Sequence, residues 1–304
     1  MSYNLITILG PTAVGKTSLA AKLAYEFKGE IISADSRQVY RGMDIGTGKD
    51  LDDYIVNNTS IPYHLIDIID PTEEFNLFLF QKLFHKTCRG ITERNVLPFL
   101  VGGTGLYIES ILKSYDLVSI EKSEKRKDEL HNKSQKELVK ILSELNPGTH
   151  NTTDLLEKER TIQAILIEES KTNSEHPIEN SNIHSFVLGV KEDREKIKKN
   201  ITLRLKHRLK NGMIDEVDKL IKNGVTSDKL YFFGLEYRFV GMYLKGELSY
   251  NDMYQKLNSA IHQFAKRQMT WFRKMERNGI KINWLEGPDF PTAVKFINEQ
   301  ELEF

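Results

Sequence analysis

The sequence predicts an α/β fold in which a mostly parallel sheet is flanked by helices and carries a helical insertion domain. Short apolar segments alternate with helix-like segments, a pattern typical of parallel sheets. The first apolar segment also runs directly into a glycine-rich loop that ends in Lys-Thr. With 304 residues, 39% of them hydrophobic, the chain is long enough to bury a substantial core.

The first expected strand, residues 5–9, leads into a complete G-x-x-x-x-G-K-T loop. In such loops the backbone N–H groups face phosphate oxygens, the lysine adds a mobile positive charge, and the threonine hydroxyl can bind Mg²⁺. Residues 18–28 have helical spacing, so phosphate would lie at a helix N-terminus. This context favours a P-loop NTPase-like core over a simple strand-to-helix turn. The expected phosphate-binding residues are Gly10, Pro11, Thr12, Ala13, Val14, Gly15, Lys16 and Thr17, with Thr17 as metal ligand.

Further strands are expected where apolar runs recur. The predicted segments are residues 30–35, 64–69, 96–101 and 185–190, with a helix over residues 75–89 before the fourth strand. The last strand returns to the core after a charged, polar stretch. Residues 113–184 therefore form the expected helical insertion, with helices at 135–145 and 155–170, whereas residues 1–112 and 185–304 form the catalytic core.

Asp35 ends the second strand and should face the phosphate loop, because ligands gather at the carboxyl ends of parallel strands. A carboxylate there could serve as a general base for a nucleophile that attacks beside the phosphates. The alternatives are a helix N-cap or a Mg²⁺ ligand. Gly102 to Gly105 is either a second backbone cradle or a tight turn.

Two helical segments near the C-terminus are rich in cations. Residues 193–211 are basic and could place one arginine over a phosphate, although a solvated basic face is the commoner reason for such a pattern. Residues 266–274 mix cations with aromatic residues, which suits RNA; the alternative is an amphipathic helix whose Met269, Trp271 and Phe272 pack inward.

Composition limits the remaining functions. Because the net charge is zero, any nucleic-acid partner would have to bind at a local basic patch. Cys88 is the only cysteine, so no internal disulfide is possible, and we expect it to be a small buried residue. We expect His64 and His262 to be structural rather than zinc ligands. No signal-like or membrane-length apolar run is present, which predicts a soluble cytoplasmic protein. We expect a monomer, because no long apolar heptad run occurs.

Five segments together resemble the tRNA dimethylallyltransferases (IPP transferases). They are residues 10–17, 35–49, 64–67, 101–107 and 265–273, and the combination of the P-loop with Asp-Ser-Arg-Gln is the specific part. The resemblance implies transfer of a dimethylallyl group from its diphosphate to N6 of the adenosine at tRNA position 37, just 3′ of the anticodon. The products are N6-isopentenyladenosine and diphosphate, and Mg²⁺ is the implied cofactor.

The resemblance also implies roles for individual residues. The P-loop and Lys16 would hold the leaving diphosphate rather than ATP, Arg204 would act as lid, and Asp35 would deprotonate the adenine amine. The insertion would grip the anticodon stem. The implied tRNA-binding residues are Asp35, Ser36, Arg37, Gln38, Thr104, Glu159, Arg160, Thr161, Ile162 and Gln163.

The sequence departs from the family pattern in several places. Asn200 and Gln163 replace usual arginines, and Glu236-Tyr237-Arg238-Phe239 replaces Gly-Tyr-Arg-Gln. The insertion is also short. These changes bear on tRNA grip and substrate choice more than on the diphosphate site.

Three other functions are compatible with the sequence. An isopentenyltransferase acting on free AMP, ADP or ATP would share the P-loop and Asp35 but would not need the insertion. A P-loop kinase of a small metabolite would need a Walker-B aspartate, for which Asp67 is a candidate. A non-enzymatic RNA-binding module would rely on the basic, aromatic C-terminal helix.

Overall fold

The structure, a computed structural model, describes residues 2–115, 117, 124–145, 158–171 and 182–303. The described chain divides into two compact units. Unit 1 comprises residues 1–114 and 181–304, and unit 2 comprises residues 115–180.

A six-stranded sheet forms the centre of unit 1, with strand order β5-β2-β6-β1-β7-β8 and parallel pairing between all neighbours. This arrangement confirms the predicted α/β class. The strands are β1 (Leu5–Leu9), β2 (Glu30–Ser33), β5 (Tyr63–His64), β6 (Pro98–Gly102), β7 (Ser185–Lys191) and β8 (Asn283–Glu286). A separate antiparallel pair joins β3 (Ile55–Val56) to β4 (Thr59–Ser60).

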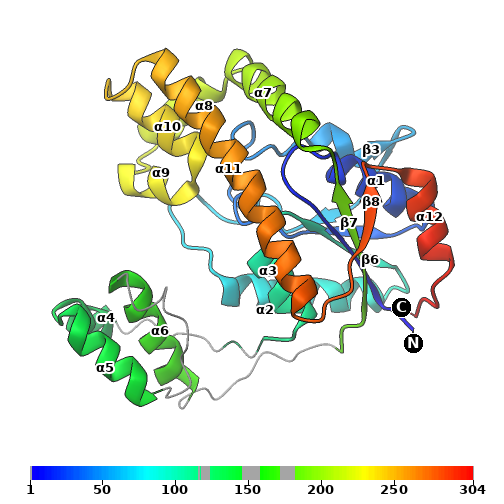
Figure 1. Cartoon of the computed structure of the whole chain (residues 1–304), viewed down its shortest axis with the longest axis horizontal. Helices are drawn as coiled ribbons and strands as arrows, with labels where there is room; N and C mark the ends of the chain where they lie inside the picture. Colours follow the sequence, from blue (N-terminus) through cyan, green and yellow to red (C-terminus); the bar gives the residue numbers. More distant parts are fainter. Residues whose placement is uncertain (1, 116, 118–123, 146–157, 172–181, 304) are drawn as a thin grey trace. The chain divides into compact units, whose positions relative to one another are not determined.

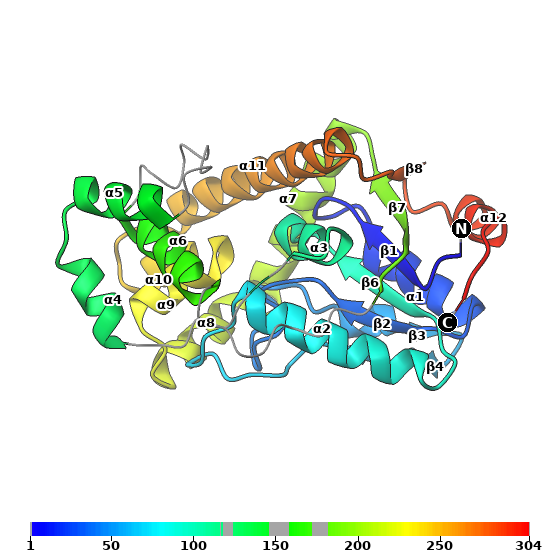
Figure 2. The same ribbon diagram turned by 90° about the horizontal axis from the view of Figure 1, so that it is seen from below.

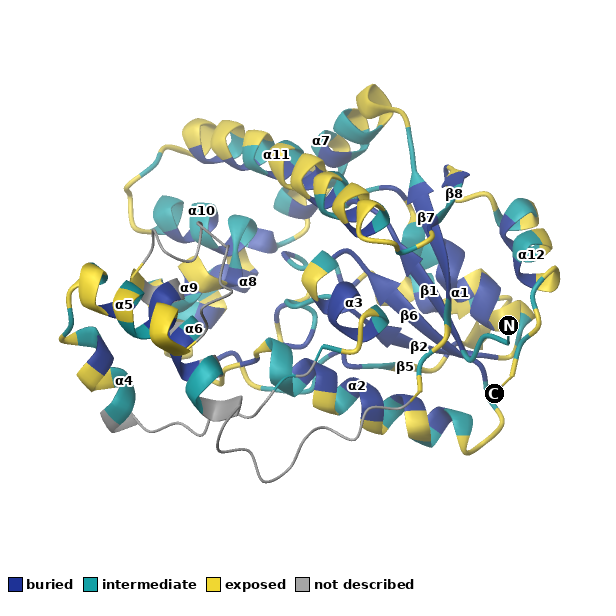
Figure 3. Ribbon diagram, turned by 60° about the horizontal axis from the view of Figure 1, so that its bottom comes forward, coloured by how far each residue is buried: buried dark blue, intermediate teal, exposed yellow. Residues whose placement is uncertain are grey.

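Alternating residues of β1 supply the two faces of the sheet. Leu5 and Leu9 belong to one buried cluster, and Ile6 and Ile8 belong to the other. All of these side chains are fully buried, as expected for a strand covered on both faces. Figure 3 shows β1, β2, β6 and most of β7 in the colour of buried residues.

Helices cover both faces of the sheet (Figures 1 and 2). One face packs against α1 (Lys16–Glu26) and α12 (Phe290–Asn298). The other face packs against a larger set of helices. This set contains α2 (Leu77–Thr92), α3 (Gly105–Leu112), α7 (Arg194–Lys210), α8 (Met213–Lys222), α9 (Ser227–Phe233), α10 (Leu235–Leu244) and α11 (Tyr250–Arg277).

Unit 2 is a small helical unit. It consists of α4 (Glu124–His131), α5 (Gln135–Leu145) and α6 (Lys158–Lys171). Its own apolar cluster includes Leu138, Leu142 and Ile165, each at most 1% exposed. The predicted helix at 135–145 is confirmed; the start of the helix predicted at 155–170 lies outside the described residues.

The strand predicted at residues 64–69 was wrong over most of its length, because only Tyr63–His64 pairs with β2. Leu65 and Asp67 have left-handed backbone conformations, with φ of 61° and 55°, which a strand does not allow. The buried ammonium of Lys49 forms an ion pair with Asp67. The backbone N–H groups of Asp67 and Ile68 donate instead to the backbone oxygens of Gln38 and Val39, at 3.0 and 2.8 Å. Strand β8 and helix α12 were not predicted.

Candidate active site

Four parallel strands bring their carboxyl ends to one cavity of about 490 Å³. β1 contributes the P-loop, β2 contributes Asp35, β6 contributes Gly102 and β7 contributes Glu192. Helix α7 adds Lys196, Asn200, Leu203 and Arg204 to the lining, and further residues come from the segment 47–54 and from Pro288. The cavity therefore lies where ligands bind in open α/β sheets.

The P-loop wraps the start of α1 in the way the sequence predicts. Gly15 is the N-cap of α1 with φ of 81°, a left-handed conformation that glycine adopts without steric cost. Residues 12 to 17 line the cavity, whereas Gly10 and Pro11 lie just outside it. Gly10 is needed for close packing, because a Cβ there would lie 2.6 Å from the backbone oxygen of Val190.

Lys16 is the cation closest in sequence to the loop's turn. Its Nζ donates a long hydrogen bond of 3.4 Å to the backbone oxygen of Pro11. Burial lowers the pKa of Lys16 to about 8, partly opposed by the negative charge of Asp35 and reinforced by Arg204. A bound anion would raise that pKa again, because it favours the charged ammonium.

Arg204 reaches the loop from the opposite wall. Its Nη2 donates to the hydroxyl of Thr12. Burial, followed by the nearby charge of Arg208, lowers the pKa of Arg204 to about 10, so the guanidinium is charged at neutral pH. Arg204 therefore contacts the phosphate loop and lines the same cavity.

Two side-chain amides without a role predicted from the sequence form hydrogen bonds that support the P-loop. The Gln268 side chain accepts from the Thr12 backbone N–H at 2.9 Å and donates to the Gly103 backbone oxygen at 2.9 Å. The Asn200 Nδ2 donates to the Ala13 backbone oxygen at 3.2 Å. Asn200, one of the departures from the family pattern, therefore supports the P-loop from α7.

Asp35 lines the cavity together with Lys16 and Thr17. Its Oδ1 accepts the backbone N–H of Arg37 at 2.9 Å, which fixes the turn that follows β2. Asp35 is not an N-cap, because the residues after it form a turn and no helix begins there. The base and metal-ligand interpretations remain for this carboxylate.

The rest of the Asp-Ser-Arg-Gln run is spread around Asp35. Gln38 lines the cavity, accepts from the Ser33 hydroxyl at 3.1 Å and donates to the Gly48 backbone oxygen at 3.1 Å. Thr104 accepts the backbone N–H of Ser36 at 3.2 Å, so its hydroxyl joins the glycine turn after β6 to the run after β2.

The predicted tRNA contacts in unit 2 fall on α6. Thr161 and Ile162 are at most 1% exposed, and the hydroxyl of Thr161 accepts from Gln135 at 2.8 Å. Their side chains thus pack inside unit 2. The side chains of Glu159, Arg160 and Gln163 lie outside the described residues.

The structure also shows the surroundings of Cys88, of the two histidines and of the cationic part of α11. Cys88 is buried. His64 bonds to Glu30 at 2.7 Å and His262 lies 3.3 Å from the Lys198 backbone oxygen, so both are structural as predicted. On α11, Phe272 is buried while Lys266, Arg267, Arg273 and Lys274 are exposed.

Among the described residues no group of three His, Cys, Asp or Glu side chains forms a metal site. No described helix has the length and apolarity to cross a membrane.

Two family models match the sequence of this chain. The family model described as IPP transferase matches residues 38–275, and that described as Isopentenyl transferase matches residues 3–64. The chain belongs to the IPP transferase family and is an enzyme of the transferase class.

Similar proteins cover nearly the whole chain. The tRNA dimethylallyltransferase 1 of Geotalea uraniireducens is 53% identical, over 96% of this chain and 95% of that protein. The tRNA dimethylallyltransferase 2 of Bacteroides fragilis is 48% identical, over 99% of both chains. The crystal structure of the tRNA isopentenylpyrophosphate transferase of Bacillus halodurans has a TM-score of 0.68 at 32% identity, covering 97% of this chain and 94% of that one.

Proposed function

We propose that this enzyme transfers the dimethylallyl group of dimethylallyl diphosphate to N6 of the adenosine at tRNA position 37. The observation that carries the proposal is the meeting of Asp35, the P-loop and Arg204 around one cavity. That shared cavity supports a role for Asp35 as proton acceptor and for the P-loop and Arg204 as the anion-binding groups.

In the reaction, the bond between the allylic carbon and the diphosphate oxygen breaks, and a bond from adenine N6 to that carbon forms. N6 must lose one proton, and Asp35 would accept it as general base. The leaving diphosphate gains negative charge, which the loop N–H groups, Lys16 and Arg204 stabilise. Gln268 and Asn200 hold the loop so that little reorganisation is needed.

The oxygen donors in the cavity fit Mg²⁺. Thr17 lines the cavity, as do the carboxylates of Asp35, Asp50 and Asp53. Mg²⁺ binds through one or two protein oxygens plus substrate phosphates and water, so a full protein cage is not required. Thr17 would hold the ion, which would neutralise diphosphate charge when bound.

Unit 2 is proposed to grip the anticodon stem, as expected for residues 113–184. Its helices include the segment from Glu159 to Gln163. Because Thr161 and Ile162 are buried, they would support that grip by shaping α6. We further expect the enzyme to be a cytoplasmic monomer.

The kinase alternative loses its main support. Asp67, the candidate Walker-B residue, forms an ion pair with the buried Lys49 and does not line the cavity. The carboxylates at the cavity belong to other segments. An experiment is needed to distinguish prenylation of tRNA from prenylation of a free adenine nucleotide.

The test is mass spectrometry of nucleosides after incubation with Mg²⁺, dimethylallyl diphosphate and either an unmodified anticodon stem-loop or AMP. We expect N6-isopentenyladenosine from the RNA only. The D35N variant should bind both substrates with little change but lose at least about 100-fold in turnover. Product from AMP alone would contradict the tRNA assignment, and full activity of D35N would contradict the role of Asp35 as base.

A further inference from the structure

The active-site cavity is lined by a third cation besides Lys16 and Arg204. This residue is Lys196, which lies near the start of α7. Its Nζ forms an ion pair of 2.5 Å with Oε2 of Glu192, a carboxylate that lines the same cavity. One of the positive charges at the cavity is therefore held by a carboxylate of the protein itself.

One face of α7 follows the P-loop. Lys196, Asn200 and Arg204 are spaced by four residues, so they share this face. Arg204 donates to the hydroxyl of Thr12, and Asn200 donates to the backbone oxygen of Ala13 at 3.2 Å. Traced back towards its N-terminus, the helix thus follows the loop from Thr12 to Ala13, and Lys196 is the next residue on that face.

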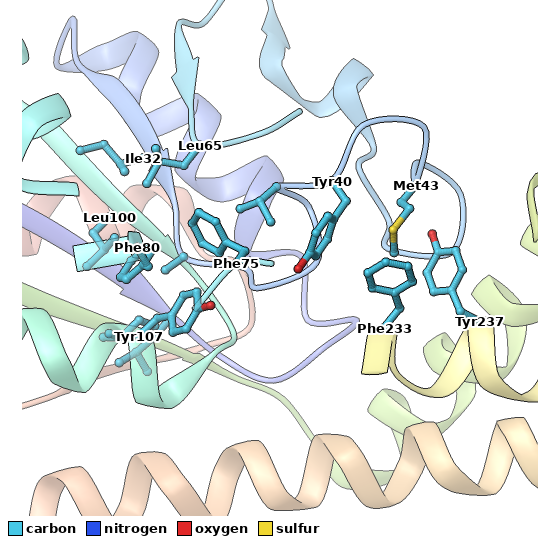
Figure 4. Close-up of a cluster of buried hydrophobic side chains, with 14 of the residues drawn as sticks. Ile32, Tyr40, Met43, Leu65, Phe75, Phe80, Leu100, Tyr107, Phe233 and Tyr237 are labelled. Atoms are coloured by element: carbon cyan, nitrogen blue, oxygen red, sulfur yellow. The ribbon is translucent and has the colours of Figure 1, made fainter. Parts of the chain in front are cut away.

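Another face of α7 fixes the helix in the core. Ile201 and Leu205 are 1% and 2% exposed and belong to the larger buried cluster; Figure 4 shows another part of this cluster, around Tyr40 and Phe233. The side chain of Lys196, by contrast, is 60% exposed. The helix backbone is therefore held in place, while the lysine side chain has room to change its partner.

Glu192 lies beside the segment that covers the glycine of the P-loop. A Cβ added to Gly287 would lie 3.3 Å from Oε2 of Glu192. The next residue, Pro288, packs on the loop, since a Cβ added to Gly15 would lie 3.2 Å from its Cγ. The ion pair between Glu192 and Lys196 therefore stands at the edge of the phosphate loop.

The ion pair is of a kind that an anionic ligand can replace. The hydrogen bond from Lys196, together with that from the backbone N–H of Asp193 at 3.1 Å, lowers the pKa of Glu192, so the carboxylate is charged at neutral pH. A partly exposed pair four residues apart is weak, because solvent screening and side-chain entropy offset the attraction. A diphosphate offers an ammonium more negative charge than one carboxylate does.

We propose that Lys196 is a third diphosphate-binding cation, which is paired with Glu192 before the substrate binds and donates to a phosphate oxygen afterwards. This inference rests on the proposed function. The family pattern has an arginine at position 200, where this chain has Asn200. Asn200 holds the loop backbone but carries no charge, so Lys196, one helical turn earlier, supplies the positive charge instead. Glu192 competes for Lys196 and thereby favours release of the product diphosphate.

The first test is calorimetry of inorganic diphosphate binding, in buffer containing Mg²⁺, to wild type, K196M, K196R and the matched control K198M. Lys198 pairs with Glu195 at 2.8 Å on the same helix and does not line the cavity, so K198M removes an equal charge elsewhere. We expect K196M to weaken binding about tenfold, K196R to stay within about threefold of wild type, and K198M to stay within about twofold. Unchanged affinity in K196M would overturn the proposal.

The E192Q variant separates direct binding from mere neutralisation of Glu192. The proposal predicts that E192Q binds inorganic diphosphate about threefold more tightly than wild type, because the competing negative charge is gone. It also predicts that the double variant K196M/E192Q binds about tenfold more weakly than E192Q. If Lys196 only neutralises Glu192, its removal has no effect once the carboxylate is gone. A double variant that binds as tightly as E192Q would therefore overturn the proposal.

Diphosphate binding is measured without turnover, which keeps the two proposals separate. A wild type that binds inorganic diphosphate but prenylates no RNA counts against the proposed function, and the variants still decide the role of Lys196. A wild type that prenylates RNA, with a K196M variant of unchanged diphosphate affinity, counts against Lys196 alone.

Discussion

The carboxylate of Glu216 accepts the hydroxyl of Tyr237 at 2.8 Å and, in the same buried position, closes the turn of residues 44–46. The backbone N–H groups of Asp44, Ile45 and Gly46 donate to it at 2.9, 2.6 and 3.0 Å. Four donors satisfy a carboxylate that would otherwise be costly to bury. The turn then passes through Gly48, whose backbone oxygen holds Gln38 at the cavity.

Replacing Glu216 by glutamine should loosen this turn. An amide presents an NH₂ group to N–H donors, so the E216Q variant is expected to lose about 2 kcal/mol of unfolding free energy. It should also lower turnover, because Gln38 loses its support. Urea unfolding and steady-state kinetics measure both effects. Y237F, which removes one donor and keeps the carboxylate, should cost about 1 kcal/mol; an E216Q variant as stable as Y237F would contradict this account.

Gln268 should matter for diphosphate binding more than for stability. Q268A removes both bonds that join the P-loop to Gly103, and we expect affinity for the diphosphate analogue to fall about five- to tenfold. Q268E keeps the acceptor for the Thr12 N–H but has no donor for Gly103, and it should lie between Q268A and wild type. Calorimetry gives the order, and an unchanged affinity in Q268A would show that the loop holds its shape alone.

The pH dependence of diphosphate binding should report Lys16. Because burial lowers the pKa of Lys16 to about 8 in the ligand-free protein, the ammonium loses its proton as pH rises past 8. Affinity for the diphosphate analogue should then fall, approaching about tenfold per pH unit. Calorimetry in buffers of different ionisation enthalpy should also detect proton uptake on binding near pH 8.

The lowered pKa of Lys16 should also change the free energy of unfolding, which can be compared between the wild type and the K16M variant. The folded-state pKa is below the unfolded value of 10.5, so the unfolded chain binds more protons between pH 8 and 10.5. Burying the ammonium therefore destabilises the wild type below pH 8, and this cost disappears as pH rises. K16M should be the more stable protein at pH 7, and the difference should shrink towards pH 10.5. A constant difference would contradict the lowered pKa.

Two glycines of one loop offer a matched pair. Gly42 and Gly48 have φ of 70° and 71°, but an added Cβ meets nothing within 4 Å at Gly42, whereas at Gly48 it would lie 1.9 Å from Nη2 of Arg208. G42A should cost about 1 kcal/mol from backbone strain alone. G48A should cost about 1–3 kcal/mol more by displacing Arg208. Thermal unfolding compares them, and equal losses would show that Arg208 moves freely.

The sequence was most informative where function depends on neighbouring residues. The P-loop is contiguous, so its strand, turn and helix could all be predicted from residues 5 to 28. The placement of Arg204 came from the family resemblance, because nothing in a basic helix distinguishes the one guanidinium that faces Thr12 from the others on its solvated side.

Gln268 could have been found from periodicity. On α11 the buried positions are Met253, Leu257, Ile261, Ala265, Gln268, Phe272 and Met275, and the glutamine is the one polar member of that stripe. A polar residue in an apolar stripe needs buried partners, although the sequence does not say which. The bend at Leu65 and Asp67 was not predictable, since the backbone of this segment bonds to Gln38 and Val39, which are distant in the sequence. β8 is only four residues long, too short for a clear pattern.

The bond between Thr12 and Gln268 joins positions that are 256 residues apart. Strand β1 likewise lies between β6 and β7, so the first strand of the chain gains one of its two neighbours only after residue 185. During synthesis, the phosphate loop therefore emerges long before the residues that brace it. An N-terminal fragment that ends before α7 would carry the complete loop motif while lacking Asn200, Arg204 and Gln268, and loop closure over such distances is slow. The ability to bind diphosphate should accordingly be acquired late in folding, with the docking of α7 and α11.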